Sequence, residues 1–266
     1  MSGTLQIAVE GVGLWAPGLP GWDAGAAALC GNVELSTQAP ARPAPAVLSP
    51  NERRRAPESV LLALDVAAQA CAMAGRDGAQ LPHVFASAYG DLAINDYLCA
   101  TLARAPLEVS PTRFHNSVHN APAGYWAIAT GCRESSTAIS AADTTFGAGL
   151  LEAALLAHAE QRAVLFAVFD VAASGPLSDV IACDIAFAAA WVLAPVSSRA
   201  VATLTLNFRP PPAPLAPRAD LLHAVYATNP AARSLPLLVA LARREGTRLR
   251  VDAAPDLEFS MEVGFD

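Results

Sequence analysis

The sequence contains no lysine, and charged residues of any kind are scarce. All 17 basic residues are arginine, and charged residues make up only 15% of the chain, against about a quarter in an average soluble protein. The absence of lysine excludes any reaction that depends on a lysine side chain. The formal net charge of −7 argues against nucleic acid as a partner, because binding phosphates requires a concentrated basic face.

Cysteine pairs, long apolar runs and phosphate-binding loops are also missing. The five cysteines are widely spread and never in CxxC spacing, so neither a disulfide framework nor a zinc site is indicated. The N-terminus lacks a basic segment followed by an apolar one, and no run reaches the roughly 18 apolar residues of a membrane span. Glycine-rich phosphate loops and the G-x-S-x-G pattern of hydrolases are absent. We expect a soluble cytoplasmic protein with neither a cofactor nor a metal.

Hydrophobic residues, by contrast, make up 53% of the chain. With so little polar material to cover its outside, the protein could present a surface to a partner. The alternative is simple alanine enrichment, which raises the hydrophobic fraction without creating apolar patches. Composition alone leaves both interpretations open.

Hydrophobic periodicity predicts a layered α/β fold with apolar strands covered on both faces. Strands are expected at residues 5–14, 84–89, 137–142, 163–171, 185–194 and 200–207, and helices at residues 60–73, 92–105, 124–130 and 145–161. Ser49, Pro50 and Glu52 form a capping-box pattern that predicts a further helix start, and Pro57 is expected to start or kink the next helix. Gly75 is expected to end the helix at residues 60–73.

The pattern changes after residue 208. Residues 209–217 hold five prolines and are predicted to form a linker. Residues 234–244 are predicted to form one amphipathic helix, and residues 257–263 an edge strand. We therefore divide the chain into a domain at 1–208 and a short remnant at 209–266.

Three segments resemble the β-ketoacyl synthases of type II fatty acid and polyketide systems. They are LQIAVEGVGLWAPG (5–18), ASAYGDL (86–92) and the ungapped stretch from SPTRFHNSVHNAPAG to GAGLLEAA (110–154). The resemblance covers roughly residues 5–207. It implies a thiolase-like layered fold that corresponds to the N-terminal half of a synthase, with a truncated C-terminal half.

The departures from that family imply a loss of catalysis. Asp143 stands where the family has its nucleophilic cysteine, and a carboxylate cannot form the stable thioester that condensation needs. The family's catalytic lysine and two histidines lie in its C-terminal half, but this chain has no lysine, and His223 is its only histidine after His158. We expect Asp143 to cap the following helix, with no catalytic residue in the chain.

The resemblance also suggests which residues face an acyl tunnel or a partner. Ordinary core packing or solvation is the alternative role for each of these side chains. His115 and His119 have the spacing of two metal ligands on a helix, but no third ligand is evident. The tunnel or interface candidates are Tyr89, Arg113, Phe114, His115, Val118, His119, Tyr125, Trp126 and Phe146.

Within the family, the member that has lost its cysteine is the chain length factor, which shapes the acyl tunnel of an active synthase. The short form, with its stretches at 51–59 and 114–120, is similar to the chain-length-factor-like proteins of bacterial aryl polyene (xanthomonadin-type) pigment systems. The resemblance implies a heterodimer with an active synthase through the strand at 137–142, and contact with acyl carrier protein through that complex. Two alternatives stay open: a residual acyl-thioester decarboxylase or hydrolase using Asp143, and a stand-alone module that binds acyl chains or carrier protein.

Overall fold

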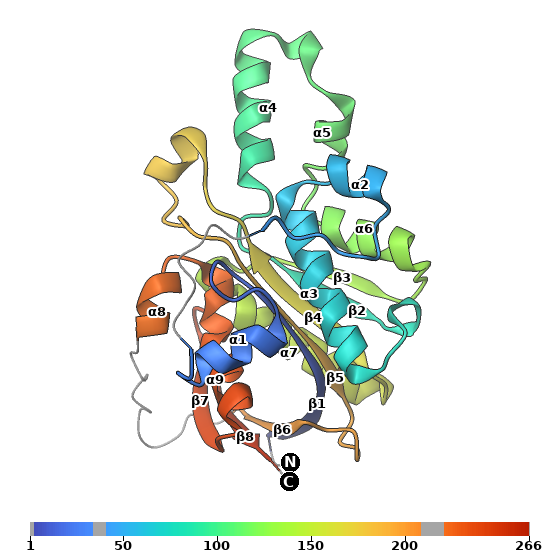
Figure 1. Cartoon of the computed structure of the whole chain (residues 1–266), viewed down its shortest axis with the longest axis vertical. Helices are drawn as coiled ribbons and strands as arrows, with labels where there is room; N and C mark the ends of the chain where they lie inside the picture. The colour runs from blue at the N-terminus through green and yellow to red at the C-terminus, as the bar shows by residue number, and fades with distance from the viewer. Residues whose placement is uncertain (1–2, 34–40, 209–220, 266) are drawn as a thin grey trace.

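The computed structural model describes residues 3–33, 41–208 and 221–265 (Figure 1). The proline-rich stretch at 209–217 lies outside the described residues. The strands are β1 (Thr4–Trp15), β2 (His83–Ala86), β3 (Ser136–Ile139), β4 (Val164–Asp170), β5 (Phe187–Ala194), β6 (Ala202–Asn207), β7 (Thr247–Ala254) and β8 (Leu257–Gly264). The helices are α1 (Trp22–Leu29), α2 (Pro50–Arg55), α3 (Glu58–Ala74), α4 (Leu92–Arg104), α5 (Pro111–His115), α6 (Ala121–Thr130), α7 (Thr145–Glu160), α8 (Leu221–Tyr226) and α9 (Leu235–Arg243).

These strands form one mixed sheet in the order β3-β2-β4-β5-β1-β6-β8-β7. Strand β2 pairs in parallel with β3 and β4, whereas the remaining pairings are antiparallel. The central strands β4 and β5 are buried along their whole length, as expected for strands covered on both faces. The predicted layered α/β fold is thus confirmed.

Helices α3 and α6 cover one face of the sheet. Helix α3 lies directly against β1 because two glycines of that strand leave room for the helix backbone. A Cβ atom at Gly13 would stand 2.0 Å from the carbonyl oxygen of Val66, and one at Gly11 would stand 2.2 Å from that of Ala70. These glycines therefore set the depth at which the buried helix packs.

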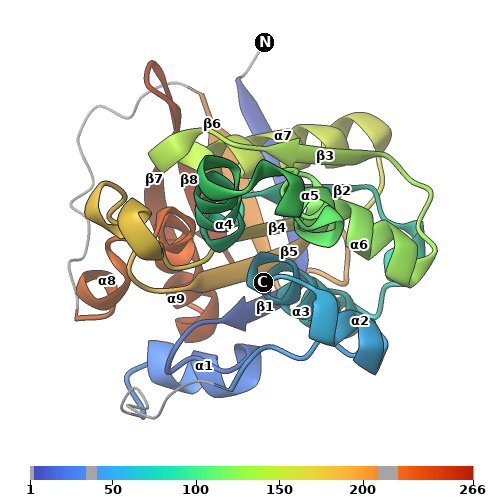
Figure 2. The ribbon, with the colours of Figure 1, turned by 90° about the horizontal axis from the view of Figure 1, so that it is seen from above.

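Helices α7, α9 and α1 cover the opposite face. The aromatic rings of Phe146, Phe166 and Trp191 pack together beneath α7, with centroids 5.5 to 6.2 Å apart. Strand β7 lies on α7, where Gly147 again allows backbone contact, since a Cβ there would meet the Asp252 carbonyl oxygen at 2.2 Å. Helices α7 and α3 thus lie on opposite sides of β4 and β5 (Figure 2), and α7 also contacts β7 of the C-terminal hairpin.

A bulge in β1 keeps its apolar side chains on one face. The register of β1 shifts between Val9 and Gly11, so the residues that face α7 change from odd numbers (Ile7, Val9) to even ones (Val12, Leu14). The extra residue, Glu10, is 2% exposed and accepts two hydrogen bonds from the Arg76 guanidinium at 2.8 and 2.9 Å. This ion pair stabilises the bulge, because it neutralises a carboxylate that would otherwise be buried alone.

The predicted elements match the structure closely up to residue 208. The capping box is present, since Ser49 accepts from the Glu52 N–H and the Glu52 carboxylate accepts from the Ser49 N–H. Pro57 precedes α3, and Gly75 ends it in a left-handed conformation. The strand expected at 84–89 stops at Ala86, for a reason that the site explains, and the strand expected at 137–142 spans only Ser136–Ile139. Helices α1 and α5 were not predicted.

The C-terminal segment contributes more to the sheet than expected. The helix predicted at 234–244 is present as α9 and the strand predicted at 257–263 as β8. The prediction of an edge position for that strand is wrong, because β8 lies between β6 and an unpredicted strand, β7. The division of the chain at residue 208 stays a prediction. None of the described helices is both long and apolar enough to cross a bilayer.

Candidate functional site

The carboxyl ends of β2, β3 and β4 meet at one edge of the sheet, because these three strands run parallel. The turn at 87–90 follows β2, an elbow at 140–145 follows β3 and precedes α7, and Asp170 ends β4. In open α/β sheets, this edge is where ligands and reacting groups usually lie. It is therefore the candidate functional site.

The elbow has an unusual backbone that threonine hydroxyl groups hold in place. Ala142 has a φ of 47°, a left-handed conformation that costs a residue with a Cβ about 1–2 kcal/mol. The Thr145 hydroxyl accepts from the Ala141 N–H at 2.9 Å and donates to the Ala142 carbonyl at 2.7 Å. The Thr144 hydroxyl donates to the Ala141 carbonyl at 2.8 Å. The chain thus maintains a strained strand-to-helix turn, which is typical of functional sites.

Asp143 lies on this elbow but does not cap α7 as predicted. The N-cap of α7 is Thr144, without a side-chain capping bond, and Asp143 belongs to the 3-10 turn (Ala142–Thr144) before it. Its side chain is exposed, and no hydrogen bond or ion pair within the described part of the chain engages its carboxylate. Asp143 thus follows the left-handed Ala142 and is exposed, and its carboxylate makes no capping bond to α7.

Replacing Ala142 by glycine should stabilise the isolated chain by about 0.5–1 kcal/mol, because glycine adopts positive φ without steric cost. The free energy of unfolding, measured by urea denaturation, tests this expectation. Ala141→Gly is the matched control. Ala141 has a negative φ of −147°, so glycine there should only add freedom to the unfolded chain and lower stability. Equal effects of the two substitutions would show that the elbow is not strained.

The turn at 87–90 is anchored to Asp170, a fully buried residue. The Ser87 hydroxyl donates to Asp170 Oδ1 at 2.8 Å, and the Tyr89 N–H donates to the same oxygen at 3.1 Å. The Gly90 N–H in turn donates to Ser87 Oγ at 2.9 Å. The turn therefore leaves the sheet after Ala86, which is why β2 is shorter than predicted.

The electrostatics of the site follow from this burial. Burial raises the pKa of Asp170 to about 6, against the opposing effects of its hydrogen bonds from Ser87 and the turn and of the nearby His119. The second carboxylate oxygen, Oδ2, is buried without a hydrogen-bond partner. Burial also raises the pKa of the Tyr89 hydroxyl, and the carboxylate of Asp143 raises it further. Tyr89 and Asp143 therefore lie close enough to interact across the site.

The two candidate histidines are not arranged as a pair of metal ligands. His115 is exposed at the end of α5, whereas His119 follows that helix, so the two are not on one helix as the spacing suggested. His119 Nε2 lies 2.8 Å from the Ser87 carbonyl oxygen, which attaches the segment before α6 to the turn. Across the described ranges, no cluster of three or more metal-ligating side chains forms.

Several of the other candidates lie on the surface, in α5 and in the segment that follows it. Phe114 is 65% exposed and Val118 is 52% exposed. The Arg113 guanidinium stacks on the Tyr97 ring, 3.9 Å from its centroid. Tyr125 is half-buried, and its hydroxyl donates to Asn116 at 3.2 Å.

Two candidates belong to the core instead. Trp126 is 1% exposed and packs on Phe85 and under Gly78. Phe146 is 3% exposed, inside the aromatic cluster under α7. Neither ring is accessible to a partner or an acyl chain in this conformation. Sequence reasoning missed several exposed large apolar side chains, and one of them is Ile128 on α6, which is 77% exposed.

Strand β3 is an unpaired edge of the sheet. Its residues alternate between exposed and half-buried, and none of them is charged: Ser136, Thr137, Ala138 and Ile139. The β2 amides bond to the carbonyl oxygens of Ser135 and Ile139, so alternation directs the backbone groups of Ser136 and Ala138 away from the sheet. Such an uncharged edge is available to pair with a strand of another chain.

Sequence reasoning also missed Asp170 and its partner Ser87. The available signal was an aspartate that ends an otherwise apolar run, AVLFAVFD at 163–170. A buried carboxylate at the end of a strand requires donors, but the sequence does not say which segment supplies them. Only the parallel pairing of β2 with β4 brings Ser87 to it.

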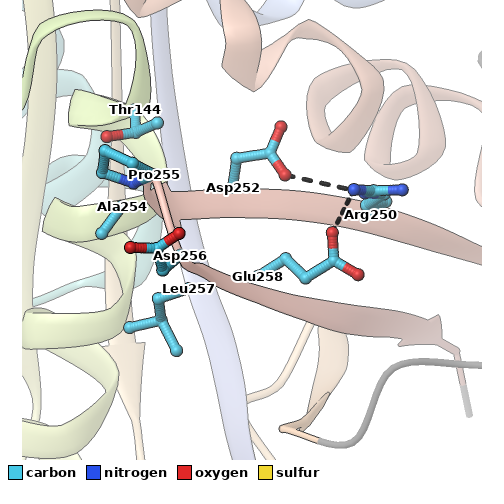
Figure 3. Close-up of a pocket in the computed structure, with 8 residues that line it drawn as sticks. All are labelled: Thr144, Arg250, Asp252, Ala254, Pro255, Asp256, Leu257 and Glu258. Carbon is cyan, nitrogen blue, oxygen red and sulfur yellow. Dashed lines mark ion pairs between the residues drawn. The ribbon is translucent and has the colours of Figure 1, made fainter.

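A cavity of about 470 Å³ lies between the elbow and the C-terminal hairpin (Figure 3). Among its eight lining residues, Arg250 is the only cation, and it pairs with Asp252 at 3.6 Å and with Glu258. Asp256 adds a further acidic side chain. The balance of charge is negative, so the cavity disfavours the phosphate of a carrier-protein arm or the carboxylate of a malonyl group.

Comparison with known proteins gives a consistent result. Residues 29–253 match the family model described as "Beta-ketoacyl synthase, N-terminal domain". No curated protein matches the sequence closely enough to count as a relative.

Solved structures with a similar fold include a ketosynthase (ApeO) in complex with its chain length factor (ApeC) from Xenorhabdus doucetiae, at 22% identity and a TM-score of 0.68, covering 97% of this chain and 96% of that one. The ishigamide ketosynthase/chain length factor matches at 14% identity and a TM-score of 0.69, covering 97% of this chain and 98% of that one. A type II polyketide acyl carrier protein in complex with its ketosynthase (AntDE:AntF) matches at 12% identity and a TM-score of 0.72, covering both chains fully. At these identities, the likeness establishes the fold.

Proposed function

The chain belongs to the family of β-ketoacyl synthase N-terminal domains, and on that premise we propose that it is a non-catalytic, chain-length-factor-like subunit. It pairs with an active β-ketoacyl synthase and shapes the acyl tunnel of that enzyme in polyene or polyketide biosynthesis. The observation that carries this proposal is the elbow. Its backbone is strained at Ala142, but the side chain that it exposes, Asp143, is a carboxylate.

The chemistry of the elbow supports a non-catalytic role. Condensation needs a thiolate that accepts an acyl group and a base or cation that assists it. Asp143 offers a carboxylate without a thiol, and no described histidine forms a hydrogen bond with it. His119, the histidine associated with the site, contacts a backbone carbonyl instead. Asp143 is therefore expected to form no acyl adduct.

The surface around β3 supports pairing. We define the partner face as the β3 edge together with the exposed apolar side chains of Phe114, Val118 and Ile128. Helix α6 contacts β3, so Ile128 and the edge strand belong to one region. Apolar anchors beside an unpaired strand are typical of a permanent interface.

Among the resembling systems, we assign the proposed role to the aryl polyene pathways. One of the similar solved structures is itself a ketosynthase in complex with its chain length factor. Acyl carrier protein would reach the acyl tunnel through the heterodimer rather than through the acidic cavity of this chain. Phe114 and Tyr89 remain the side chains proposed to limit the depth of the tunnel.

Co-expression with an active synthase of the aryl polyene type, followed by size-exclusion chromatography, tests the proposal. We expect a 1:1 complex that extends malonyl units on carrier protein, whereas the isolated chain is inactive and shows no added mass after incubation with acyl carrier protein. A stable adduct on this chain, or a monomer that ignores the synthase, would contradict the proposal.

Restoring the thiol by Asp143→Cys should not create a condensing enzyme. The groups that act with the cysteine are absent, and catalytic residues of this kind contribute only as a set. Chain extension by the isolated variant, followed by mass spectrometry of the carrier protein, is the measurement. Asp143→Ser is the control for the change in size, and measurable extension by the cysteine variant alone would mean that the site has been misassigned.

A further inference from the structure

Asp170 is a buried acidic residue whose carboxylate anchors the 87–90 turn. Its Oδ1 accepts hydrogen bonds from the Ser87 hydroxyl and from the Tyr89 N–H, while its backbone carbonyl accepts from Asn229 Nδ2 at 3.0 Å. The residue is fully buried, and a buried carboxylate with fewer donors than it can accept costs folding free energy. Packing alone gives no reason for a carboxylate at this position.

The turn at 87–90 connects Asp170 to three other parts of the site. The Ser140 hydroxyl of the elbow donates to the Ala88 carbonyl at 3.0 Å, and His119 contacts the Ser87 carbonyl. Asp91, directly after the turn, caps α4 by accepting from the Ile94 N–H at 3.0 Å. A shift of the turn would therefore move Tyr89, the elbow and the base of α4 together.

We propose that Asp170 is a positioning residue that fixes the 87–90 turn, and thereby the place of Tyr89 beside the elbow, so that it determines the length of the product made by the partner synthase. This inference rests on the proposed function, because it assigns a product-length role to a residue that the acyl chain does not touch. Tyr89 acts on the chain, whereas Asp170 acts through Tyr89.

The hydrogen bonds of the turn give the proposal a specific chemical requirement, an acceptor at the position of Oδ1. Asp170→Asn retains that acceptor, removes the charge and puts an amide NH2 group in place of the unpartnered Oδ2. Asp170→Leu has a similar volume and removes the acceptor, so that the Ser87 hydroxyl and the Tyr89 N–H lose their partner. Comparing the two variants separates the acceptor from the charge and from the filled volume.

The first measurement is the product distribution of the heterodimer with an active synthase. We expect the asparagine variant to make the wild-type product. In the leucine variant, the ratio of the main product to the next shorter one should change about tenfold, because a small change in the fit of an apolar pocket alters selectivity by about that much. An assembled leucine variant with the wild-type distribution would overturn the inference. If that variant does not assemble, Ser87→Ala replaces it, since this change removes one bond to Asp170 and the acceptor of the Gly90 N–H.

The second measurement needs no partner and no activity. Amide hydrogen exchange of Tyr89 and Gly90 in the isolated chain should be about tenfold faster in the leucine and Ser87→Ala variants and near wild type in the asparagine variant. Ser59→Ala is the matched control, because it removes a 2.8 Å serine-to-aspartate bond to Asp91 but leaves the turn intact, and it should change neither exchange nor products. Unchanged exchange in the test variants would overturn the positioning role. Faster exchange with a chain that never pairs with a synthase would instead overturn the proposed function and, with it, the role in product length.

Discussion

Ala138→Pro is expected to weaken the proposed heterodimer about 100-fold or more, which corresponds to roughly 3 kcal/mol. The backbone N–H of Ala138 points away from β2, since the neighbouring residues on β3 make the bonds to that strand. Proline removes this N–H and places its ring where a strand of the partner would approach. The chain itself should remain folded, because no hydrogen bond to β2 is lost.

The measurement is the affinity for the active synthase, by surface plasmon resonance or by sizing over a range of concentrations. Ala138→Ser is the matched control, since it keeps the N–H and a small side chain and should bind like the wild type. The free energy of unfolding of each isolated chain shows whether the fold is unchanged. Wild-type affinity of a folded proline variant would rule out pairing through the β3 edge.

Asp170→Asn is expected to stabilise the isolated chain at neutral pH by up to about 3 kcal/mol. Burial raises the pKa of Asp170 to about 6 from its ordinary value of 3.8, and each unit of difference is worth about 1.4 kcal/mol. The folded chain therefore binds a proton more tightly than the unfolded chain between pH 4 and pH 6. Stability contributed by the protonated form is present below pH 4 and is lost as the pH rises through 6.

The asparagine variant cannot lose this contribution, because its amide is neutral at every pH and its oxygen still accepts from Ser87 and Tyr89. Urea denaturation of both proteins from pH 4 to pH 8 is the measurement. We expect similar stabilities at pH 4 and a difference that grows up to about pH 7. Asp143→Asn is the control, since that carboxylate is exposed.

His119, Cys183 and Tyr89 are ionisable groups near Asp170. The variant His119→Gln shows how much of the pH dependence of stability belongs to the histidine. A difference that is constant with pH would show that Asp170 is not the titrating group.

Local sequence patterns determined most of the secondary structure. The capping box at Ser49 and the glycine stop at Gly75 involve neighbours within one or two turns, so the sequence contains all that they need. The apolar run of β4 likewise required burial on both faces, whatever its partners were. The same local patterns predicted that Asp143 lies at the junction before a helix, which is α7. They also supported the resemblance to the β-ketoacyl synthases, the family that the family model confirms.

What the sequence could not determine depends on contacts between distant segments. A helix cap was the ordinary expectation for Asp143, but the elbow with its positive φ at Ala142, held by the hydroxyl groups of Thr144 and Thr145, leaves Asp143 in the turn before the helix without a capping bond. Trp126 and Phe146 are aromatic, a residue type that is common at interfaces. Only the packing of α6 and α7 on the sheet shows that both are core residues.

The sequence by itself determined the layered α/β fold and the start and end of most helices, and it led to the proposal that Asp143 stands in place of a nucleophile. These features depend on residue type and on spacing along the chain. Tertiary structure alone decided that β3 is an unpaired edge, that β7 contacts α7, and that Asp170 accepts a hydrogen bond from Ser87, 83 residues away in the chain. The reason is physical: strand order and buried hydrogen bonds depend on which segments are neighbours in space, and many pairings satisfy the same hydrophobic pattern.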